Sequence, residues 1–95
     1  MLISSVTLAG AIPCTGKVSA VLADHPTCGE ANIAFITSAT NGKFVCTKTT
    51  PAVSTVLSAA AMQKDLKVVF TDTVASNCDS IPEYSTVSYM VLYPQ

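Results

Sequence analysis

One segment of the chain, residues 50–64, has the spacing of an amphipathic helix. Apolar side chains recur there every three or four residues, which places them on one helical face: Val53, Val56, Leu57 and Ala60. Thr50 is the expected cap, because its hydroxyl can accept a hydrogen bond from a free N–H of the first turn, and Pro51 suits the first helical position. We expect the apolar face to cover a sheet.

Alternating apolar and polar positions predict five strands around this helix. Three precede it and two follow it, at residues 17–23, 31–37, 43–49, 66–71 and 85–93. Asn41-Gly42 predicts a hairpin turn between the second and third strands, since both residues tolerate positive φ. The order strand, strand, strand, helix, strand, strand is that of the OB fold, a mainly β, five-stranded Greek-key barrel with one helix.

The length of 95 residues allows one hydrophobic core, so residues 1–95 are expected to form a single domain. Residues 1–13 are interpreted as an N-terminal extension or an edge strand that Gly10 and Pro13 end. This stretch is apolar, but it has no basic leader and is too short for the full layout of a signal peptide. We interpret Met1 either as an added start on a processed chain or as part of the tail of a longer precursor.

Composition narrows the classes of partner. With 49% hydrophobic and 12% charged residues, the chain is apolar for its size, which favours self-association. All five basic residues are lysines, and the net charge is −1. Nucleic acid is bound by concentrated basic surfaces, usually with arginine, so it is not an expected partner. No run reaches the roughly 18 apolar residues that span a bilayer, so membrane insertion is not expected either.

Four cysteines, at positions 14, 28, 46 and 78, are widely spaced and include no C-x-x-C pair. Structural zinc normally takes two ligands from one short knuckle, and His25 is the only histidine, so we expect two disulfides and no metal. Disulfides imply a secreted or periplasmic location. The residues alone leave three connectivities open.

Four stretches of the chain resemble the receptor-binding B subunits of bacterial toxins, in which a ring of five OB-fold subunits carries an enzymatic A subunit. They are GKVSAVLADHPTC, SATNGKFVC, TPAVSTVLSAAAMQK followed by LKVVFTD, and YSTVSYMVLY, within residues 14–93. The resemblance implies a bacterial, non-catalytic subunit without a cofactor that binds cell-surface glycans. It also implies a homo-oligomer, in particular a pentamer, with a catalytic A subunit as a further partner. The alternative is a small periplasmic OB-fold protein that serves as a structural or protein-interaction factor.

The cysteine positions extend the resemblance to a pairing. Cys28 and Cys46 fall on the two arms of one hairpin, as in pertussis-like and subtilase-type B subunits. Cys14 and Cys78 resemble the cholera-type bond between the N-terminal segment and the strand after the helix. The resemblance thus implies Cys28–Cys46 and Cys14–Cys78. The chain departs from the family in having no tryptophan and no charged helix face.

The sequence contains no convincing set of catalytic residues, so we expect that the protein is not an enzyme. His25 follows Asp24, but neighbouring side chains in a strand or turn point in different directions. Serines are plentiful, yet none lies in a G-x-S-x-G or S-x-x-K pattern. The acidic residues are scattered and form no D-x-D calcium loop.

The loop of residues 73–84 is the candidate binding surface, because it gathers Asn77, Asp79 and Tyr84 beside a cysteine. A sugar needs planar apolar contact and a few fixed polar groups, which these three side chains offer. The alternative interpretation is a surface loop pinned by Cys78 and closed by Pro82.

Two further sets of residues are candidates for contacts between subunits. The outer helix face carries Ser54, Ser58 and Ala61, which are small enough for another helix to approach closely. Tyr89 and Tyr93 share one face of the last strand, and we interpret them as core or subunit-interface residues.

Overall fold

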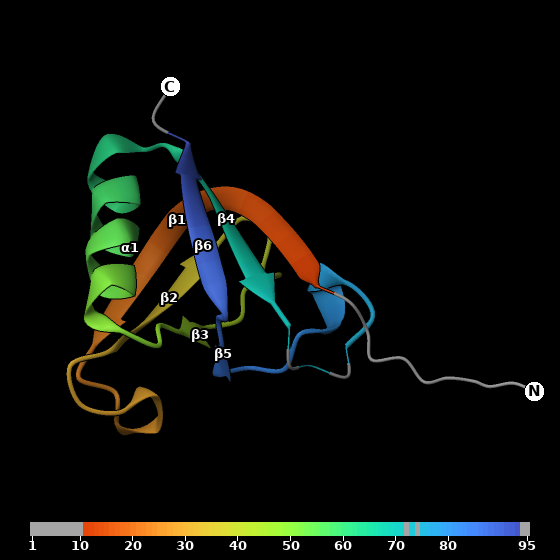
Figure 1. The fold of residues 1–95 in the computed structure, drawn as a ribbon, viewed down its shortest axis with the longest axis horizontal. Coiled ribbons are helices and arrows are strands. Elements are labelled where there is room, and N and C mark those ends of the chain that lie inside the picture. The colour runs from red at the N-terminus through yellow and green to blue at the C-terminus, as the bar shows by residue number, and fades with distance from the viewer. Residues whose placement is uncertain (1–10, 72, 74, 94–95) are drawn as a thin grey trace, which may run out of the picture.

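The structure, a computed structural model, describes residues 11–71, 73 and 75–93, which form a curled mixed β-sheet with one α-helix packed against it (Figure 1). The strands are β1 (Ile12–Ala23), β2 (Ile33–Thr37), β3 (Val45–Cys46), β4 (Asp65–Phe70), β5 (Ser85–Thr86) and β6 (Tyr89–Tyr93). Helix α1 (Thr50–Met62) lies between β3 and β4 in the chain, and the 3-10 helices η1 (Pro26–Cys28) and η2 (Cys78–Ser80) lie in loops. A mainly β fold with one helix is therefore confirmed, whereas the sheet has six strands rather than five.

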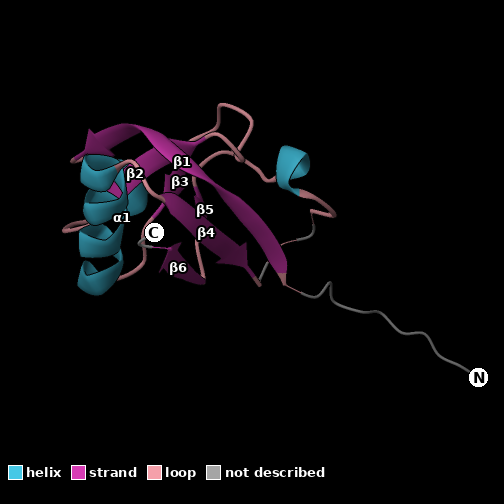
Figure 2. Ribbon diagram, turned by 90° about the horizontal axis from the view of Figure 1, so that it is seen from above, coloured by secondary structure: helices cyan, strands magenta, loops and turns pink. Residues whose placement is uncertain are grey.

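The sixth strand arises because the predicted last strand is interrupted. β5 pairs in parallel with β3, whereas β6 pairs antiparallel with β4. The sheet order β5-β3-β2-β1-β4-β6 thus puts β5 and β6 at opposite edges, although only Val87 and Ser88 separate them in the chain. Edges joined by so short a link must lie close together, so the sheet curls into a half-barrel (Figures 1 and 2).

Both halves of the sheet are built on β1, the long strand that arches behind β4 and β6 in Figure 1. Its residues 12–17 pair with β4 and its residues 18–23 with β2, with a shift of register between Val18 and Ala20. Such a shift bends a strand and lets it serve two partners. Gly16 lies just before the bend, where a Cβ would come within 2.4 Å of Ser38 Oγ, so a side chain at this position would displace the turn after β2.

The expectation that Pro13 ends a separate N-terminal strand was wrong, because Pro13 lies inside β1 and pairs with Val69. Proline is tolerated in a strand that has a free edge, and among the described residues this half of β1 pairs with β4 alone. The remainder of the predicted extension, residues 1–10, lies outside the described residues.

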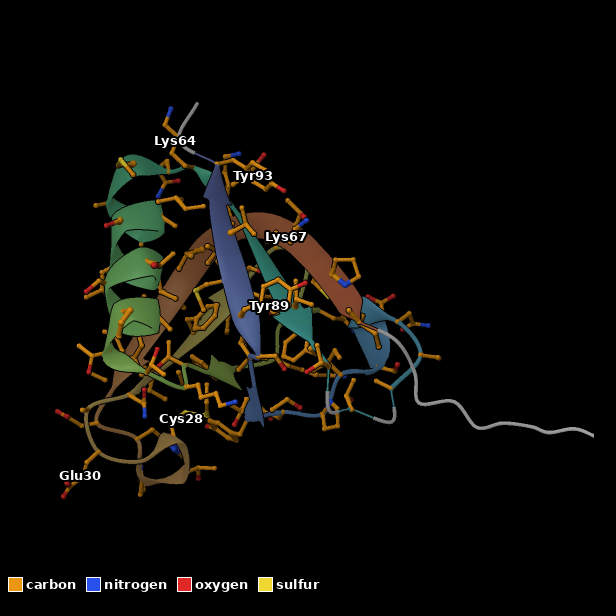
Figure 3. The ribbon with its side chains drawn as sticks, in the orientation of Figure 1. Cys28, Glu30, Lys64, Lys67, Tyr89 and Tyr93 are labelled. Atoms are coloured by element: carbon orange, nitrogen blue, oxygen red, sulfur yellow. A yellow bond between two sulfur atoms is a disulfide. The ribbon has the colours of Figure 1, made fainter. Side chains whose placement is uncertain are left out.

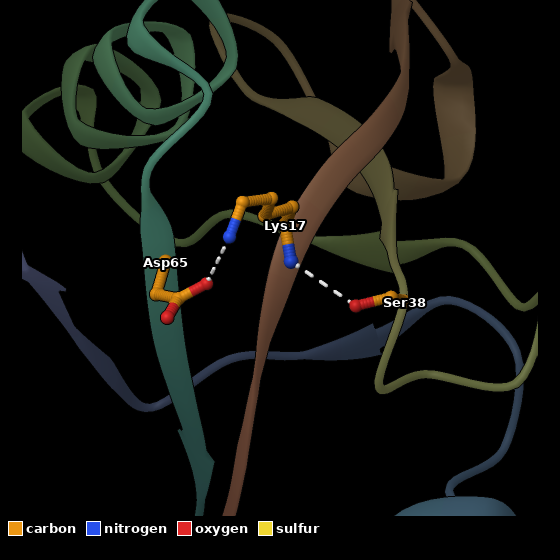
Figure 4. Close-up of polar contacts among 3 residues, drawn as sticks. All are labelled: Lys17, Ser38 and Asp65. Atoms are coloured by element: carbon orange, nitrogen blue, oxygen red, sulfur yellow. Dashed lines mark hydrogen bonds and ion pairs between the residues drawn. The ribbon is translucent and has the colours of Figure 1, made fainter.

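Polar contacts reinforce the bend of β1 (Figure 4). The Lys17 backbone N–H donates to Ser38 Oγ at 3.1 Å, and its Nζ lies 2.7 Å from Asp65 Oδ1. The two side chains of the ion pair are about half exposed, at 54% and 51%, so water screens their attraction. The Lys17–Asp65 pair therefore orients the start of β4 more than it stabilises the fold.

One face of the sheet and α1 enclose the hydrophobic core. Burial alternates along β1, and its buried residues Ile12 and Cys14 pair across the ladder with the buried Phe70 and Val68 of β4. Full burial of such side chains stabilises the fold by roughly 1.5–3 kcal/mol each. The core is completed by fully buried side chains from the other segments: Phe35, Val45, Val56 and Ile81.

The start of α1 differs by one residue from its prediction. Thr49 is the cap, and its Oγ1 accepts a hydrogen bond from the Ala52 N–H at 3.3 Å. The assignment of Thr50 as the cap and of Pro51 to the first position was wrong, because Thr49 offers the same hydroxyl one residue earlier. The helix ends at Met62 rather than residue 64, since Gln63 adopts a left-handed conformation with φ of 54°.

The core-facing side of α1 is shifted from the predicted one, because Ala59 takes the place of Leu57, while Val53 and Ala60 pack against the core as predicted. Val56 and Ala59 are buried, whereas Leu57 is 47% exposed. Including Leu57 in the core-facing set was wrong, because the helix meets β1, β4 and β6 along a line through Val56 and Ala59. The three small residues of the outer face are exposed as expected: Ser54, Ser58 and Ala61.

Cys14 is bonded to Cys78, and Cys28 to Cys46, which is the pairing that the resemblance implied. The first bond ties η2 to β1 across a sequence separation of 64, and the second ties η1 to β3 (Figure 3). Each contributes roughly 2–4 kcal/mol to stability by restricting the unfolded chain. The two bonds suggest an oxidising extracellular or periplasmic environment.

Within the described ranges, no helix has the length and apolar character that a membrane span requires.

Candidate functional site

Several polar groups of the predicted binding loop make hydrogen bonds within the fold. Asn77 caps η2, since its Oδ1 accepts from the Ser80 N–H at 3.0 Å and the Asn77 N–H donates to Ser80 Oγ at 3.4 Å. The Asp79 carbonyl accepts from Lys43 Nζ at 2.8 Å. The Asn77 amide oxygen is therefore already used, whereas the Asn77 amide nitrogen and the Asp79 carboxylate, both on exposed residues, have no described partner.

Tyr84 is likewise occupied by contacts within the fold. Its ring stacks on His25 with centroids 4.5 Å apart and on Phe44 with centroids 6.2 Å apart. Its N–H donates to the Phe44 carbonyl at 2.6 Å, and its φ is +64°. The tyrosine joins the loop before β5 to the segments around η1 and β3. Within the described ranges, no hydrogen bond links it to Asn77 or Asp79.

His25 also has a structural role. Its Nδ1 accepts a hydrogen bond from the Thr27 N–H at 3.2 Å, which caps η1. A hollow of about 340 Å³ beside it is lined by Asp24, Glu30 and the backbone of the η1 loop. The lining includes two acidic residues and one histidine, and no hydrogen bond or ion pair joins them among the described residues. Across the described ranges, no three ligating side chains gather as a metal would require.

A different site lies where the last strand breaks. Two hollows, of about 410 and 230 Å³, share the lining residues Lys48, Val87 and Ser88 and are together termed the β5–β6 groove. The first hollow is lined in addition by Phe70, Thr73, Ser85 and Thr86. The second extends over the first turns of α1 and the start of β6, and is lined by Thr49, Pro51, Ala52, Thr55, Tyr89 and Met90.

The groove follows from the way in which residues 87 and 88 bridge the two sheet edges. The Val87 N–H donates to the Cys46 carbonyl at 3.0 Å, whereas the Ser88 N–H donates to the Val69 carbonyl at 2.8 Å. Successive residues thus bond to β3 and to the end of β4, and the chain spans the space between these strands. Thr71 fixes Ser88 further, because its N–H lies 3.0 Å from Ser88 Oγ and its hydroxyl 2.7 Å from the same atom.

The groove presents groups that the fold leaves uncommitted. Tyr89 is 55% exposed on β6, in front of the sheet in Figure 3. Among the described residues, neither the Lys48 ammonium nor the Thr86 hydroxyl has a hydrogen-bond partner, and Lys48 is the one charged side chain in the described lining. Tyr89 and Tyr93 are 55% and 40% exposed, so the interpretation that they belong to the core was wrong. Their interpretation as subunit-interface residues stays a prediction.

The sequence contained weak signals for this groove. The alternation of the predicted last strand has a small polar residue, Ser88, beside the buried Val87, and that is where the strand breaks. Lys48 directly precedes the residue that caps α1. Neither signal identifies a site, because the lining comes from segments up to 42 positions apart, between Lys48 and Met90.

Comparison with known proteins finds no family model that matches the chain and no curated relative. The fold and the site together define the class of the protein as a small, disulfide-bonded, mainly β domain with one helix and an open groove at the break between its edge strands.

Proposed function

We propose that the protein is a non-catalytic binding subunit that recognises cell-surface glycans through the β5–β6 groove. The observation that carries this proposal is the half-exposed Tyr89 in a groove that also presents the Lys48 ammonium and the Thr86 hydroxyl, neither of which has a described partner. A sugar is held by contact between its C–H face and an aromatic ring, together with a few directed hydrogen bonds. The groove offers both kinds of contact.

The proposed scaffold is an OB barrel in which β5 and β6 together form the fifth strand. Three features support it. β1 pairs with both β2 and β4, α1 lies between β3 and β4, and the parallel β3–β5 pair brings the last strand to the opposite edge of the sheet. An OB barrel is five-stranded and partly open, so a break in its last strand suits the fold.

We also propose that the subunit is secreted or periplasmic and assembles into a ring, a pentamer, that can carry a catalytic A subunit. Large apolar side chains of α1 stay exposed in the single chain, namely Leu57 at 47% and Met62 at 45%. Beside Leu57, the small Ser54, Ser58 and Ala61 permit another helix to approach. Light scattering tests this part, because a ring has several times the 9.8 kDa chain mass, and a species of one chain mass contradicts it.

The second candidate function is that of a structural or protein-interaction factor on the same scaffold, without affinity for sugars. The exposed apolar residues of α1 suit it equally well. It differs from the first function at the groove, since it gives Tyr89 and Lys48 no ligand to contact.

A glycan array separates the two functions. We expect the wild-type protein to bind a restricted set of glycans, and Tyr89→Ala to lose that binding. Tyr93→Ala is the matched control, because Tyr93 lies on the same strand and is exposed but does not line the groove. An assembled wild-type protein that binds no glycan selectively contradicts the carbohydrate function and leaves the interaction factor.

A further inference from the structure

The β5–β6 groove consists of two compartments, and their sizes bear on the length of its ligand. The hollows of about 410 and 230 Å³ meet only at Lys48, Val87 and Ser88. Sites for small molecules usually measure about 300–1,000 Å³. The smaller hollow alone falls below this range, whereas the larger one alone and the two together fall within it. The groove thus has room for a ligand that extends through both compartments.

The compartments differ in chemistry. The smaller one is lined by Pro51, Ala52, Met90 and Tyr89, and the hydroxyl of Thr55 is turned to the Pro51 carbonyl at 2.9 Å. Its free surface is therefore mostly apolar. Such a wall suits the C–H face of a pyranose, not its rim of hydroxyls.

The larger compartment presents hydrogen-bonding groups with defined directions. Ser85 Oγ donates to the Pro82 carbonyl at 2.7 Å, so towards a ligand it acts as an acceptor. Thr73 Oγ1 accepts from the Ala75 N–H at 3.1 Å, which leaves its hydrogen to donate. The Thr86 hydroxyl has no described partner and can do either. This compartment therefore suits the hydroxyl rim of a sugar.

We infer that the groove binds an oligosaccharide of at least two units, one in each compartment. This inference rests on the proposed function. One unit lays its apolar face on Tyr89, and the next directs its hydroxyls to Thr73, Ser85 and Thr86. Lys48 lies at the junction and donates to oxygen atoms close to the linkage between the two units. The two walls belong to separate hollows, so the pair of compartments selects for a linked pair of units.

The test uses an array of defined mono-, di- and trisaccharides, followed by calorimetry and saturation-transfer NMR on the smallest glycan that binds. We expect disaccharides to bind at least tenfold more tightly than either component monosaccharide. Tyr89→Ala should abolish saturation transfer to one unit, and Thr86→Val should weaken binding about fivefold through the other unit. The matched controls are Tyr93→Ala and Thr15→Val, since both residues are exposed on strands and do not line the groove.

The possible results separate the two-unit ligand from the glycan-binding function itself. Tyr89 and Thr86 are both exposed, so their variants should retain the wild-type melting temperature. A monosaccharide that binds as tightly as any disaccharide overturns the two-unit ligand while the glycan-binding function stands. The same holds if both variants weaken contact with the same unit. An array on which no glycan binds overturns the function and the inference together.

Discussion

Tyr84 and Tyr89 are five positions apart, both lie near polar side chains, and the structure uses them in opposite ways. Tyr84 is half-buried, stacks on His25 and Phe44, and donates its N–H to the Phe44 carbonyl. Tyr89 is 55% exposed and lines a groove whose polar groups are partly unpaired among the described residues. A loop rich in polar and aromatic residues is therefore a binding site only where the fold leaves those groups free.

The largest effect should come from the bond that holds the loop before Tyr84. Replacing Cys14 and Cys78 together by alanine should lower the free energy of unfolding by about 2–5 kcal/mol. Urea denaturation measures this loss. Because the bond anchors η2 and not the groove, glycan affinity should stay unchanged at a temperature where the variant remains folded. Lost affinity in a variant of wild-type stability would instead place the ligand at the η2 loop.

Tyr84→Ala should be the next most damaging change. It removes two ring contacts and part of the burial around η1 and β3, which should lower the free energy of unfolding by about 2 kcal/mol. The measurement is again the denaturation midpoint. Tyr93→Ala is the control, since Tyr93 makes no described ring contact and should shift stability by less than about 0.5 kcal/mol. Equal stability of the two variants would show that the stacking on His25 and Phe44 is not structural.

Asn77→Ala should have a smaller effect of the same kind. The change removes the oxygen that caps η2, at a cost of about 1 kcal/mol in the free energy of unfolding. Asp79→Ala is the control, because the contact of Asp79 with Lys43 uses its backbone carbonyl and survives the substitution. If Asp79→Ala destabilised the protein more than Asn77→Ala, the carboxylate would have a role that the structure does not show.

Lys48→Met should leave the fold intact and act on binding alone. The ammonium is exposed and has no described partner, so the free energy of unfolding should change by less than about 0.5 kcal/mol. The dissociation constant of a glycan selected on the array should rise about threefold to tenfold, since one charge-assisted hydrogen bond is lost. Lys67→Met, a lysine of β4 outside the groove, should show no such rise.

Local signals in the sequence were enough to predict much of the fold. The capping threonine, the proline in the first turn and the period of residues 50–64 identified α1 to within two residues. Asn41 and Gly42 both adopt positive φ, as their residue types predicted. Each predicted strand overlaps an observed one, but β1 begins five residues earlier than predicted and β3 keeps only Val45–Cys46 of residues 43–49. Burial alternates along β1, where one face of the strand is covered.

The features that the sequence did not predict depend on contacts between segments far apart in the chain. β5 exists only because β3 offers a parallel partner 40 positions earlier in the chain, at Val45 for Ser85. Leu57 has the correct period for burial, but the sheet lies under Val56 and Ala59. Whether Asn77 and Tyr84 are free to bind depends on Ser80, His25 and Phe44, and composition does not record those contacts.

The most direct test of glycan binding in the β5–β6 groove measures one array-selected glycan against Tyr89→Ala and Tyr84→Ala side by side. We predict that Tyr89→Ala raises the dissociation constant at least tenfold, about 1.4 kcal/mol, without changing the denaturation midpoint. Tyr84→Ala should lower the midpoint and leave the dissociation constant within twofold of wild type. The reverse pattern, with affinity lost at Tyr84 and kept at Tyr89, would contradict the groove as the binding site.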